Sequence, residues 1–444
     1  MNVQTPAQPT EAKTESTAPP ALRKLSDTGL QPVMLRDIML KTVFRKSVET
    51  ATEIAQAVAL PVTLTTQLID ELRDMNLMQA TGTLHATSSS EMGFQLTDAG
   101  KSRALDALSQ SEYYGPMPVP LEDYKVQVKR QSIRDIHLTR QMLVDSMGHL
   151  IIPDDLIDQL GPAVGSGKSC LMYGPPGNGK SSIAEGIRAA MGDTIYIPHA
   201  LAYSGQVITL FDPIVHTPVE AEEAAGSSLR KSTSKHDTRY LLCKRPTVMT
   251  GGELMLDMLD LNYNSVSRTY QASLQLKSTG GVFIVDDLGR QEEPPQALIN
   301  RWIVPLEVGY DILALQSGEK FEVPFDTLVV FSTNFHPNDI FDQAALRRIF
   351  FKVKIDGPTQ DQFLKIFSMV AKKKKVPLNE EALLYMLKKK YPTVDNVYAN
   401  YHAPFLCDQL IAICAFEGIP NQMNPDLIDR AWENLYVKQE KIVH

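Results

Sequence analysis

The sequence has little cysteine and no long apolar run. Its four cysteines, Cys170, Cys243, Cys407 and Cys414, form no C-x-x-C pair and have no histidines at zinc-binding spacing. This pattern predicts buried thiols in a reducing compartment, without disulfides or a zinc site. No run of about eighteen apolar residues occurs, and the first residues lack the charged and then apolar pattern of a secretion signal. We therefore expect a cytoplasmic protein that is not inserted into a membrane.

The sequence also has no excess of positive charge. Its formal net charge is −8 at pH 7, whereas contacts with a phosphate backbone need a clustered cationic surface. Nucleic acid is therefore a possible but disfavoured partner, although a local basic patch is compatible with this total. Two lysine clusters, 372–375 and 388–390, are expected at helix C-termini, where cations complement the helix dipole. The length fits about two or three domains.

The N-terminal part predicts a tail, a small domain and a connector. Residues 1–31 are rich in Thr, Pro, Ala and Gln and have few bulky apolar residues, so we expect a disordered tail. Residues 33–108 predict three helices, two short β-like pieces and a closing helix, an order that looks like a winged helix. Residues 109–129 contain three prolines between Pro116 and Pro120 and predict an extended connector.

A winged helix often binds DNA, but the charges of this one favour a protein partner. Residues 34–108 hold seven basic and nine acidic side chains. The expected recognition helix, residues 64–77, carries Asp70, Glu71 and Asp74 against Arg73, and duplex DNA would repel this face. We therefore favour a module that docks a protein partner and keep DNA binding as the alternative.

The motif G-K-S occurs twice, at residues 167–169 and 179–181. A phosphate-binding loop has the form G-x-x-x-x-G-K-[ST], after a buried strand and before a helix. The first copy has Pro162 where the opening glycine would stand, and the strand-like "CLMY" follows it instead of a helix. The first copy therefore matches the phosphate-binding pattern neither in its residues nor in the elements around it. We expect it to be an entry turn into a strand, with Lys168 at its solvent end.

The second copy matches the phosphate-binding pattern at every position. Its residues are Gly174, Pro175, Pro176, Gly177, Asn178, Gly179, Lys180 and Ser181, followed by Ser182. The strand "CLMY" precedes this loop, and the helical pattern "SSIAEGIRAAMG" includes its end. Backbone N–H groups of such a loop and the positive end of the helix hold phosphates. Lys180 would reach the β- and γ-phosphates, and the Ser181 hydroxyl would hold Mg²⁺.

Two further segments supply the other groups that a nucleotide-hydrolysing site needs. The apolar strand in "GGVFIVDDLGR" ends in acid, so Asp286 would contact the magnesium shell and Asp287 would orient or activate a water. The strand in "DTLVVFSTNF" ends near Asn334, a candidate sensor of the γ-phosphate. A solvated strand end and a simple turn residue are the plain alternatives for these side chains.

The strings "GPPGNGKS", "STN" and "DQAALRRIFFKVKIDGP", together with the acid-tipped strand, resemble an AAA+ ATPase over about residues 130–440. The resemblance implies an α/β P-loop NTPase with a five-stranded parallel sheet in residues 130–357 and a helical lid in residues 358–444. It implies ATP and Mg²⁺ as cofactors and a ring of identical subunits, expected to be a hexamer. It also implies that Arg347 or Arg348 reaches the nucleotide of the next subunit.

Two features depart from the family pattern. The second acid is usually Glu, whereas this chain has Asp287, and the lid helix "APFLCDQLIAICAF" has no sensor arginine. Both favour slow hydrolysis. The segment between the P-loop helix and the acid-tipped strand is long. We expect "TIYIP" as the second core strand, then a hairpin around Gly205 with Tyr203 as a candidate pore residue, within an insertion near 202–240. Residues 151–154 are candidates to line the base.

Three functions stay open at this point. The leading hypothesis is an ATPase that remodels a protein partner recruited by the N-terminal domain, because the pattern resembles bacterial proteins described as ATPases with chaperone-like activity. The second is a DNA-associated ATPase of the helicase-loader, transposition-helper or regulator type, which the string "DDLG" also resembles. The third is an ATP-gated switch that barely hydrolyses its nucleotide.

Overall fold

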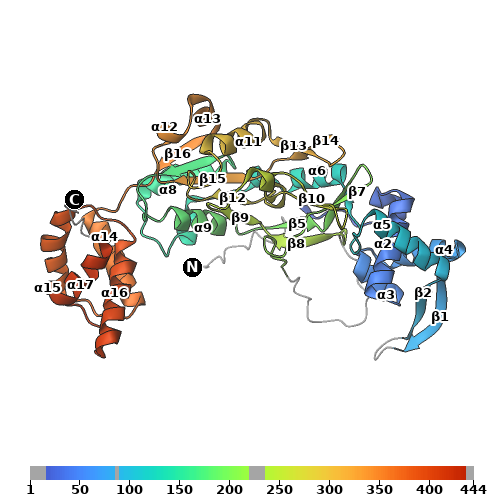
Figure 1. The fold of residues 1–444 in the computed structure, drawn as a ribbon, viewed down its shortest axis with the longest axis horizontal. Helices are drawn as coiled ribbons and strands as arrows, with labels where there is room; N and C mark the ends of the chain where they lie inside the picture. Colours follow the sequence, from blue (N-terminus) through green and yellow to red (C-terminus); the bar gives the residue numbers. More distant parts are fainter. Residues whose placement is uncertain (1–16, 86–89, 220–235, 437–444) are drawn as a thin grey trace, which may run out of the picture. The chain divides into compact units, whose positions relative to one another are not determined.

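The computed structural model describes residues 17–85, 90–219 and 236–436 (Figure 1). The chain divides into two compact units, each built from several segments. One contains residues 1–137, 191–284 and 291–329, and the other contains residues 138–190, 285–290 and 330–444. Among the described residues, none of the helices combines the length and the apolar character that a bilayer span requires. All four cysteines are buried and free, as expected.

The N-terminal part of the first unit contains the expected elements in the expected order. The helices are α2 (Pro32–Lys46), α3 (Ala51–Val58), α4 (Val62–Asp74) and α5 (Asp98–Gln110), and the antiparallel pair β1 (Met78–His85) and β2 (Ser90–Leu96) lies between α4 and α5 in the chain. The start of α3 is fixed by a capping box between Thr50 and Glu53. Ile38, Met39 and Leu72 are among the fully buried residues of its core. The winged-helix interpretation stays a prediction.

The expected tail is wrong for residues 17–31, while residues 1–16 lie outside the described residues. A short 3-10 helix spans Leu25–Thr28, and Pro20 forms a β-bridge with His236. Buried Arg239 pairs with Asp237 at 2.8 Å and donates a hydrogen bond to the carbonyl oxygen of Thr28 at 2.8 Å. The low apolar content of this segment does not prevent its packing, because Arg239 forms a hydrogen bond with the buried backbone carbonyl of Thr28.

The expected connector, residues 109–129, becomes regular earlier than predicted. Strand β3 (Val119–Pro120) leads directly into α6 (Leu121–Arg130). β3 joins β6 (Ala200–Tyr203), β7 (Gln206–Thr209), β11 (Thr269–Gln271) and β10 (Asn262–Asn264) in a mixed sheet. The predicted hairpin around Gly205 is the turn between β6 and β7. Tyr203 stacks on Phe321 with ring centroids 4.3 Å apart and donates a hydrogen bond to Glu319 at 2.9 Å, so its side chain is held within its own unit.

The expected second core strand "TIYIP" lies elsewhere. It forms β5 (Thr194–Pro198), which pairs antiparallel with β8 (Tyr240–Lys244), and Ile195 and Ile197 pack into the core of the first unit. The strand at the edge of the core sheet is instead β9 (Thr247–Thr250). Both stretches are apolar enough to form strands. Because β5 pairs with β8, it does not join the core sheet, and β9, which comes directly after β8 in the chain, takes the edge position. Residues 220–235 of the expected insertion lie outside the described residues.

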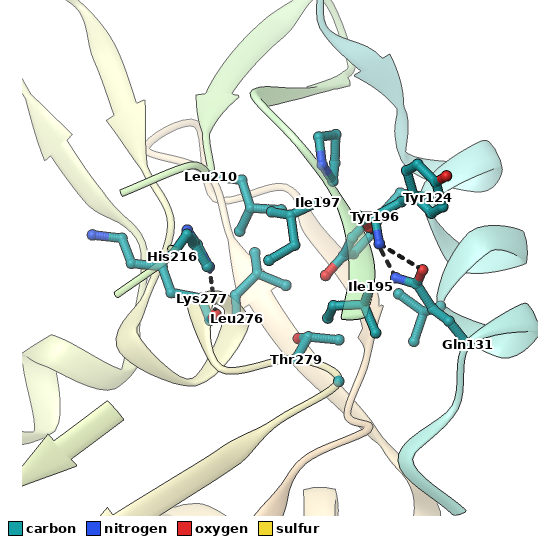
Figure 2. Close-up of a pocket in the computed structure, with 13 residues that line it drawn as sticks. Tyr124, Gln131, Ile195, Tyr196, Ile197, Leu210, His216, Leu276, Lys277 and Thr279 are labelled. Atoms are coloured by element: carbon teal, nitrogen blue, oxygen red, sulfur yellow. Dashed lines mark hydrogen bonds between the residues drawn. The ribbon is translucent and has the colours of Figure 1, made fainter. Parts of the chain in front are cut away.

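A small cavity lies in the core of the first unit. Figure 2 shows Tyr124, Gln131 and Tyr196 among the side chains around it. The amide of Gln131 exchanges two hydrogen bonds with the backbone of Tyr196, each 2.9 Å long. The cavity volume is about 10 Å³, which is room for about one water molecule. This cavity is therefore too small to be a ligand site.

The core sheet has the strand order β16–β4–β15–β12–β9. Its remaining strands are β4 (Cys170–Tyr173), β12 (Val282–Val285), β15 (Leu328–Thr333) and β16 (Phe351–Lys354). β4 pairs in parallel with β15 and with β16. Every residue of β12 and β15 is buried, as expected for strands covered on both faces. The α/β fold with a five-stranded parallel sheet is confirmed.

Helices lie before and between these strands in the chain. The second unit contains α7 (Arg140–Ser146), α8 (Asp154–Gly165) and α9 (Lys180–Ala190). The first unit contains α10 (Leu274–Lys277) and α11 (Pro295–Val308).

The C-terminal residues form the expected helical lid. Its helices are α14 (Gln360–Lys373), α15 (Glu380–Tyr385), α16 (His402–Glu417) and α17 (Pro425–Leu435). Phe363, Leu406 and Trp432 belong to their shared core. The first lysine cluster lies at the end of α14, as predicted, and the second lies in a π-helical turn after α15. Lys374 pairs with Asp408, and Lys390 pairs with Asp429 at 2.7 Å.

Candidate nucleotide-binding site

The second GKS copy forms a loop between β4 and α9. Gly174, Gly177 and Gly179 have φ values of +145°, +76° and +85°, a region that other residues rarely adopt. A Cβ on Gly174 would lie only 2.2 Å from the carbonyl oxygen of Ile355. The spacing of glycines in the motif therefore follows from backbone geometry, and the loop ends at the N-terminus of an eleven-residue helix. Backbone N–H groups and a helix N-terminus suit a bound phosphate.

Lys180 is buried at the first position of α9. Its ammonium donates hydrogen bonds to the carbonyl oxygens of Gly174, at 2.9 Å, and Pro175, at 3.0 Å. Burial lowers the pKa of this side chain, while the charges of Asp287 and Asp286 act in the opposite direction. The ammonium is thus held directly over the loop, where a lysine of this motif meets phosphate oxygens.

The acidic pair and the candidate sensor lie where the sequence predicted. The Ser181 hydroxyl donates to Asp286 Oδ2 at 2.6 Å, and Asn334 Nδ2 donates to Asp287 Oδ1 at 2.8 Å. The N–H of Leu288 donates to the carbonyl oxygen of Ser332 at 2.7 Å, which ties the segment after β12 to β15. Loop, acids and amide therefore meet at the carboxyl ends of β4, β12 and β15.

Asp287 has a φ of +49°. A residue with a side chain in this left-handed conformation is strained by roughly 1–3 kcal/mol, and such strain persists only where surrounding contacts determine it. The bonds from Asn334 and Leu288 supply these contacts. In this conformation the Asp287 carboxylate accepts a hydrogen bond from the Asn334 amide.

The residues around Ser181 fit a magnesium ion. Across the described part of the chain, no group of three or more His, Cys, Asp or Glu side chains could hold a metal by itself. Mg²⁺ in nucleotide sites needs no such group, because it takes one or two protein oxygens and completes its shell with phosphates and waters. The Ser181 hydroxyl and the Asp286 carboxylate, 2.6 Å apart, are oxygen donors of this kind.

The lid supplies contacts to the loop that the sequence reasoning missed. Asn400 Nδ2 donates to the carbonyl oxygen of Asn178 at 3.0 Å, and the Asn400 N–H donates to Asn178 Oδ1 at 3.3 Å. The N–H of Tyr401 donates to the carbonyl oxygen of Gly177 at 3.0 Å. The available signal was the polar and aromatic run "VYANYHA" directly before an apolar helix. Asn178 in the loop is therefore a docking point for the lid.

A large cavity lies beside the loop within the second unit. Its volume is about 690 Å³, and its lining includes Gly177, Asn400 and Tyr401. Ile151, Ile152 and Pro153 also line it, and a role of this segment towards a base stays a prediction. Asp154, the last residue of that segment, pairs with Arg140 at 2.7 Å. The size is in the range of a small-molecule site.

Arg347 and Arg348 end helix α13 (Gln343–Arg348), three residues before β16 begins. Arg347 is exposed, and Arg348 is half-buried and donates to the carbonyl oxygen of Ala344 at 2.7 Å. The placement before the last strand of the sheet matches the expectation. A role towards another subunit stays a prediction, because it concerns a second copy of the chain.

Gly177→Ala is expected to weaken ATP binding by about tenfold or more, because about 1.4 kcal/mol of strain is worth a factor of ten. The new Cβ would lie 2.2 Å from Cδ1 of Tyr401, at a φ of +76°. Gly177→Ala with Tyr401→Ala removes the clash but not the backbone strain, so it should regain part of the affinity. Gly161→Ala on α8 is the matched control, since its Cβ would meet nothing within 4 Å. Calorimetric titration with ATP decides, and wild-type affinity in Gly177→Ala would contradict the loop geometry.

Comparisons with known proteins place few constraints on this chain. Residues 359–434 match a family model described as "Domain of unknown function (DUF8689)". No curated protein matches the chain. A solved RuvB mutant from Thermotoga maritima is 13% identical, with a TM-score of 0.37, over 69% of this chain and 74% of that chain.

Two further solved structures give similar values. A Thermotoga maritima structure described as the RuvB Holliday junction branch migration motor is 13% identical, with a TM-score of 0.34, over 72% of this chain and 73% of that chain. NtrX from Brucella abortus in complex with ADP is 11% identical, with a TM-score of 0.40, over 78% of this chain and 68% of that chain. At these TM-scores no conclusion about the function of this chain rests on the likeness.

Proposed function

We propose that this chain is a Mg²⁺-dependent ATPase of the AAA+ type. The observation that carries the proposal is the pair of contacts at the end of the phosphate-binding loop, Ser181 with Asp286 and Asn334 with Asp287. They join residues from three separate segments into one polar group beside Lys180. Chance placement would not bring a loop hydroxyl, two acids and an amide together at the same edge of a parallel sheet, which is where such sheets bind ligands.

Each side chain has a role in this proposal. The backbone of residues 174–179 cradles the phosphates, and Lys180 neutralises their charge. Ser181 and Asp286 hold the magnesium ion, and Ser182 lies next to the loop on α9. Asp287 orients or activates the attacking water, and Asn334 holds the Asp287 carboxylate and contacts the γ-phosphate. The cavity of about 690 Å³ beside the loop receives the base and ribose.

The proposal includes an assembly of identical subunits, expected to be a hexameric ring, with Arg347 or Arg348 completing the site of the neighbour. An arginine supplied from another subunit stabilises charge that develops on the transferred phosphate. Arg347 is exposed at the end of α13, which supports such a role because an arginine that acts in trans must reach beyond its own subunit.

The N-terminal domain, proposed to be a winged helix, recruits a protein partner that the ATPase remodels. On α4, Arg73 is paired with Asp70 at 3.0 Å. Glu71 is half-buried, and Asp74 is exposed. This face favours a protein over duplex DNA. A DNA-associated ATPase is the alternative, and salt-sensitive binding of the full chain to duplex DNA would favour it. The short acid at position 287 keeps an ATP-gated switch as a third possibility.

The proposal is tested by measuring ATP turnover against protein concentration, with mass followed by light scattering. A shared site predicts that turnover per subunit rises as subunits assemble. The double variant Arg347→Ala/Arg348→Ala is expected to bind ATP but to lose most of its turnover, by about 10³-fold or more. Tight binding with no turnover at any concentration would leave a switch in place of an ATPase.

A further inference from the structure

The first GKS copy is buried at its serine, although it binds no phosphate in the proposed function. Ser169 is only 4% exposed. Its hydroxyl donates to the carbonyl oxygen of Arg348 at 3.2 Å and accepts from the N–H of Phe350 at 3.2 Å. The carbonyl oxygen of Ser169 accepts from the N–H of Phe351 at 3.0 Å. Three hydrogen bonds thus join this one residue to Arg348, Phe350 and Phe351.

These bonds fix a short turn on both of its sides. Helix α13 ends at Arg348 and β16 begins at Phe351, so only Ile349 and Phe350 lie between them. Ile349 is fully buried, and the Lys168 ammonium lies 3.8 Å from the ring centroid of Phe350. The Ser169 hydroxyl bridges the last residue of the helix and the residue before the strand. The end of α13 is therefore held to the start of β4.

We propose that Ser169 is a positioning residue for the arginine pair. It acts through the backbone of Arg348 and does not touch the nucleotide. The inference rests on the proposed function, in which Arg347 or Arg348 completes the site of the neighbouring subunit. Removal of the hydroxyl frees the end of α13 while the ladder between β4 and β16 stays in place. A displacement of about 1 Å in a catalytic group can cost about a hundredfold in rate.

The competing explanation is that Ser169 only stabilises β4 and so supports the loop of its own subunit. The two explanations differ in which subunit is damaged. A positioning role impairs the arginines that a subunit offers to its neighbour and spares its own ATP affinity. A role in β4 impairs the subunit's own loop and spares its arginines. Rings that mix two variants separate these cases.

The experiment uses the full chain carrying Ser169→Ala, co-expressed under two affinity tags with a second variant and purified through both tags. Ser169→Ala alone should bind ATP as the wild type does and turn over about tenfold to a hundredfold more slowly. Mixed with Lys180→Ala, each Ser169→Ala loop that faces an intact arginine pair should regain wild-type turnover. Mixed with Arg347→Ala/Arg348→Ala, no intact site forms and turnover should stay low.

The opposite pattern, with rescue by the arginine-deficient subunit and none by Lys180→Ala, would overturn the inference. So would wild-type turnover or a weakened ATP affinity in Ser169→Ala. The control pair is Lys180→Ala mixed with Arg347→Ala/Arg348→Ala, which must regain activity if sites are shared between subunits. If this pair stays inactive, the shared site in the proposed function is wrong and the inference is rejected with it. If the pair regains activity, a failure of Ser169→Ala concerns the inference alone.

Discussion

Lys180→Ala is expected to lower ATP turnover by about 10²- to 10³-fold or more, which is the typical cost of removing one preorganised partner of a developing charge. The Lys180 ammonium lies over the loop, bonded to the carbonyl oxygens of Gly174 and Pro175. It is the cation on α9 that stands at the loop, and alanine leaves the phosphates without it. Calorimetric titration with ATP measures the affinity of the variant, and a phosphate-release assay measures its turnover.

The matched control for this variant is Lys168→Ala. Lys168 occupies the same position in the first GKS copy, but its side chain is exposed and lies over the ring of Phe350. The Lys168→Ala variant should therefore bind ATP with wild-type affinity. Equal loss of affinity in both variants would show that charge in general, and not the loop, governs binding. Wild-type affinity and turnover in Lys180→Ala would contradict the assignment of the loop.

Asp287→Asn is expected to lower turnover by about 10²- to 10⁴-fold, the range for loss of a general base, while ATP stays bound. In the wild-type chain, Asn334 Nδ2 donates a hydrogen bond to Asp287 Oδ1 at 2.8 Å. The asparagine side chain keeps an oxygen that can accept this hydrogen bond, so the local geometry should persist. What is lost is the charge that draws a proton from water. A single-turnover assay with bound ATP separates this effect from a loss of binding.

Asp287→Glu is the informative control for that variant. It retains the charge and lengthens the side chain by one methylene, which restores the acid that the resembled family usually carries. The Asp287→Glu variant should therefore hydrolyse ATP at least as fast as Asp287→Asn. Its rate compared with that of the wild type tests whether the short acid limits wild-type turnover. If Asp287→Asn hydrolyses ATP like the wild type, Asp287 is not the activating group, and another acid at the site must be sought.

Much of the site could be predicted because its parts are local in the sequence. The loop glycines need positive φ values, and the motif spacing records that need. β12 and β15 are short, wholly apolar and buried on both faces, and the polar residues directly after them must lie at the sheet edge. A strand that ends in Asp286 and another that ends near Asn334 therefore indicate the site without knowledge of the tertiary structure.

What could not be predicted depends on contacts between distant residues. β5 and β9 are both plausible strands, and only the pairing of β5 with β8 decides which of them joins the core sheet. The lid contact joins Asn178 to Asn400 across 222 residues, and the local pattern around Asn400 does not say which distant residue it contacts. The segment of residues 17–31 packs because Arg239 reaches Thr28 from 211 positions away.

The most direct test of the central claim is equilibrium binding of ATP to the wild-type chain, measured with Mg²⁺ and again with a chelator present. The account predicts saturable binding at one site per subunit, weaker without Mg²⁺ because Ser181 and Asp286 would hold the ion and the ion would offset the charge of the phosphates. It also predicts that Ser181→Ala removes most of the difference between the two conditions. No binding of ATP under either condition would contradict the account.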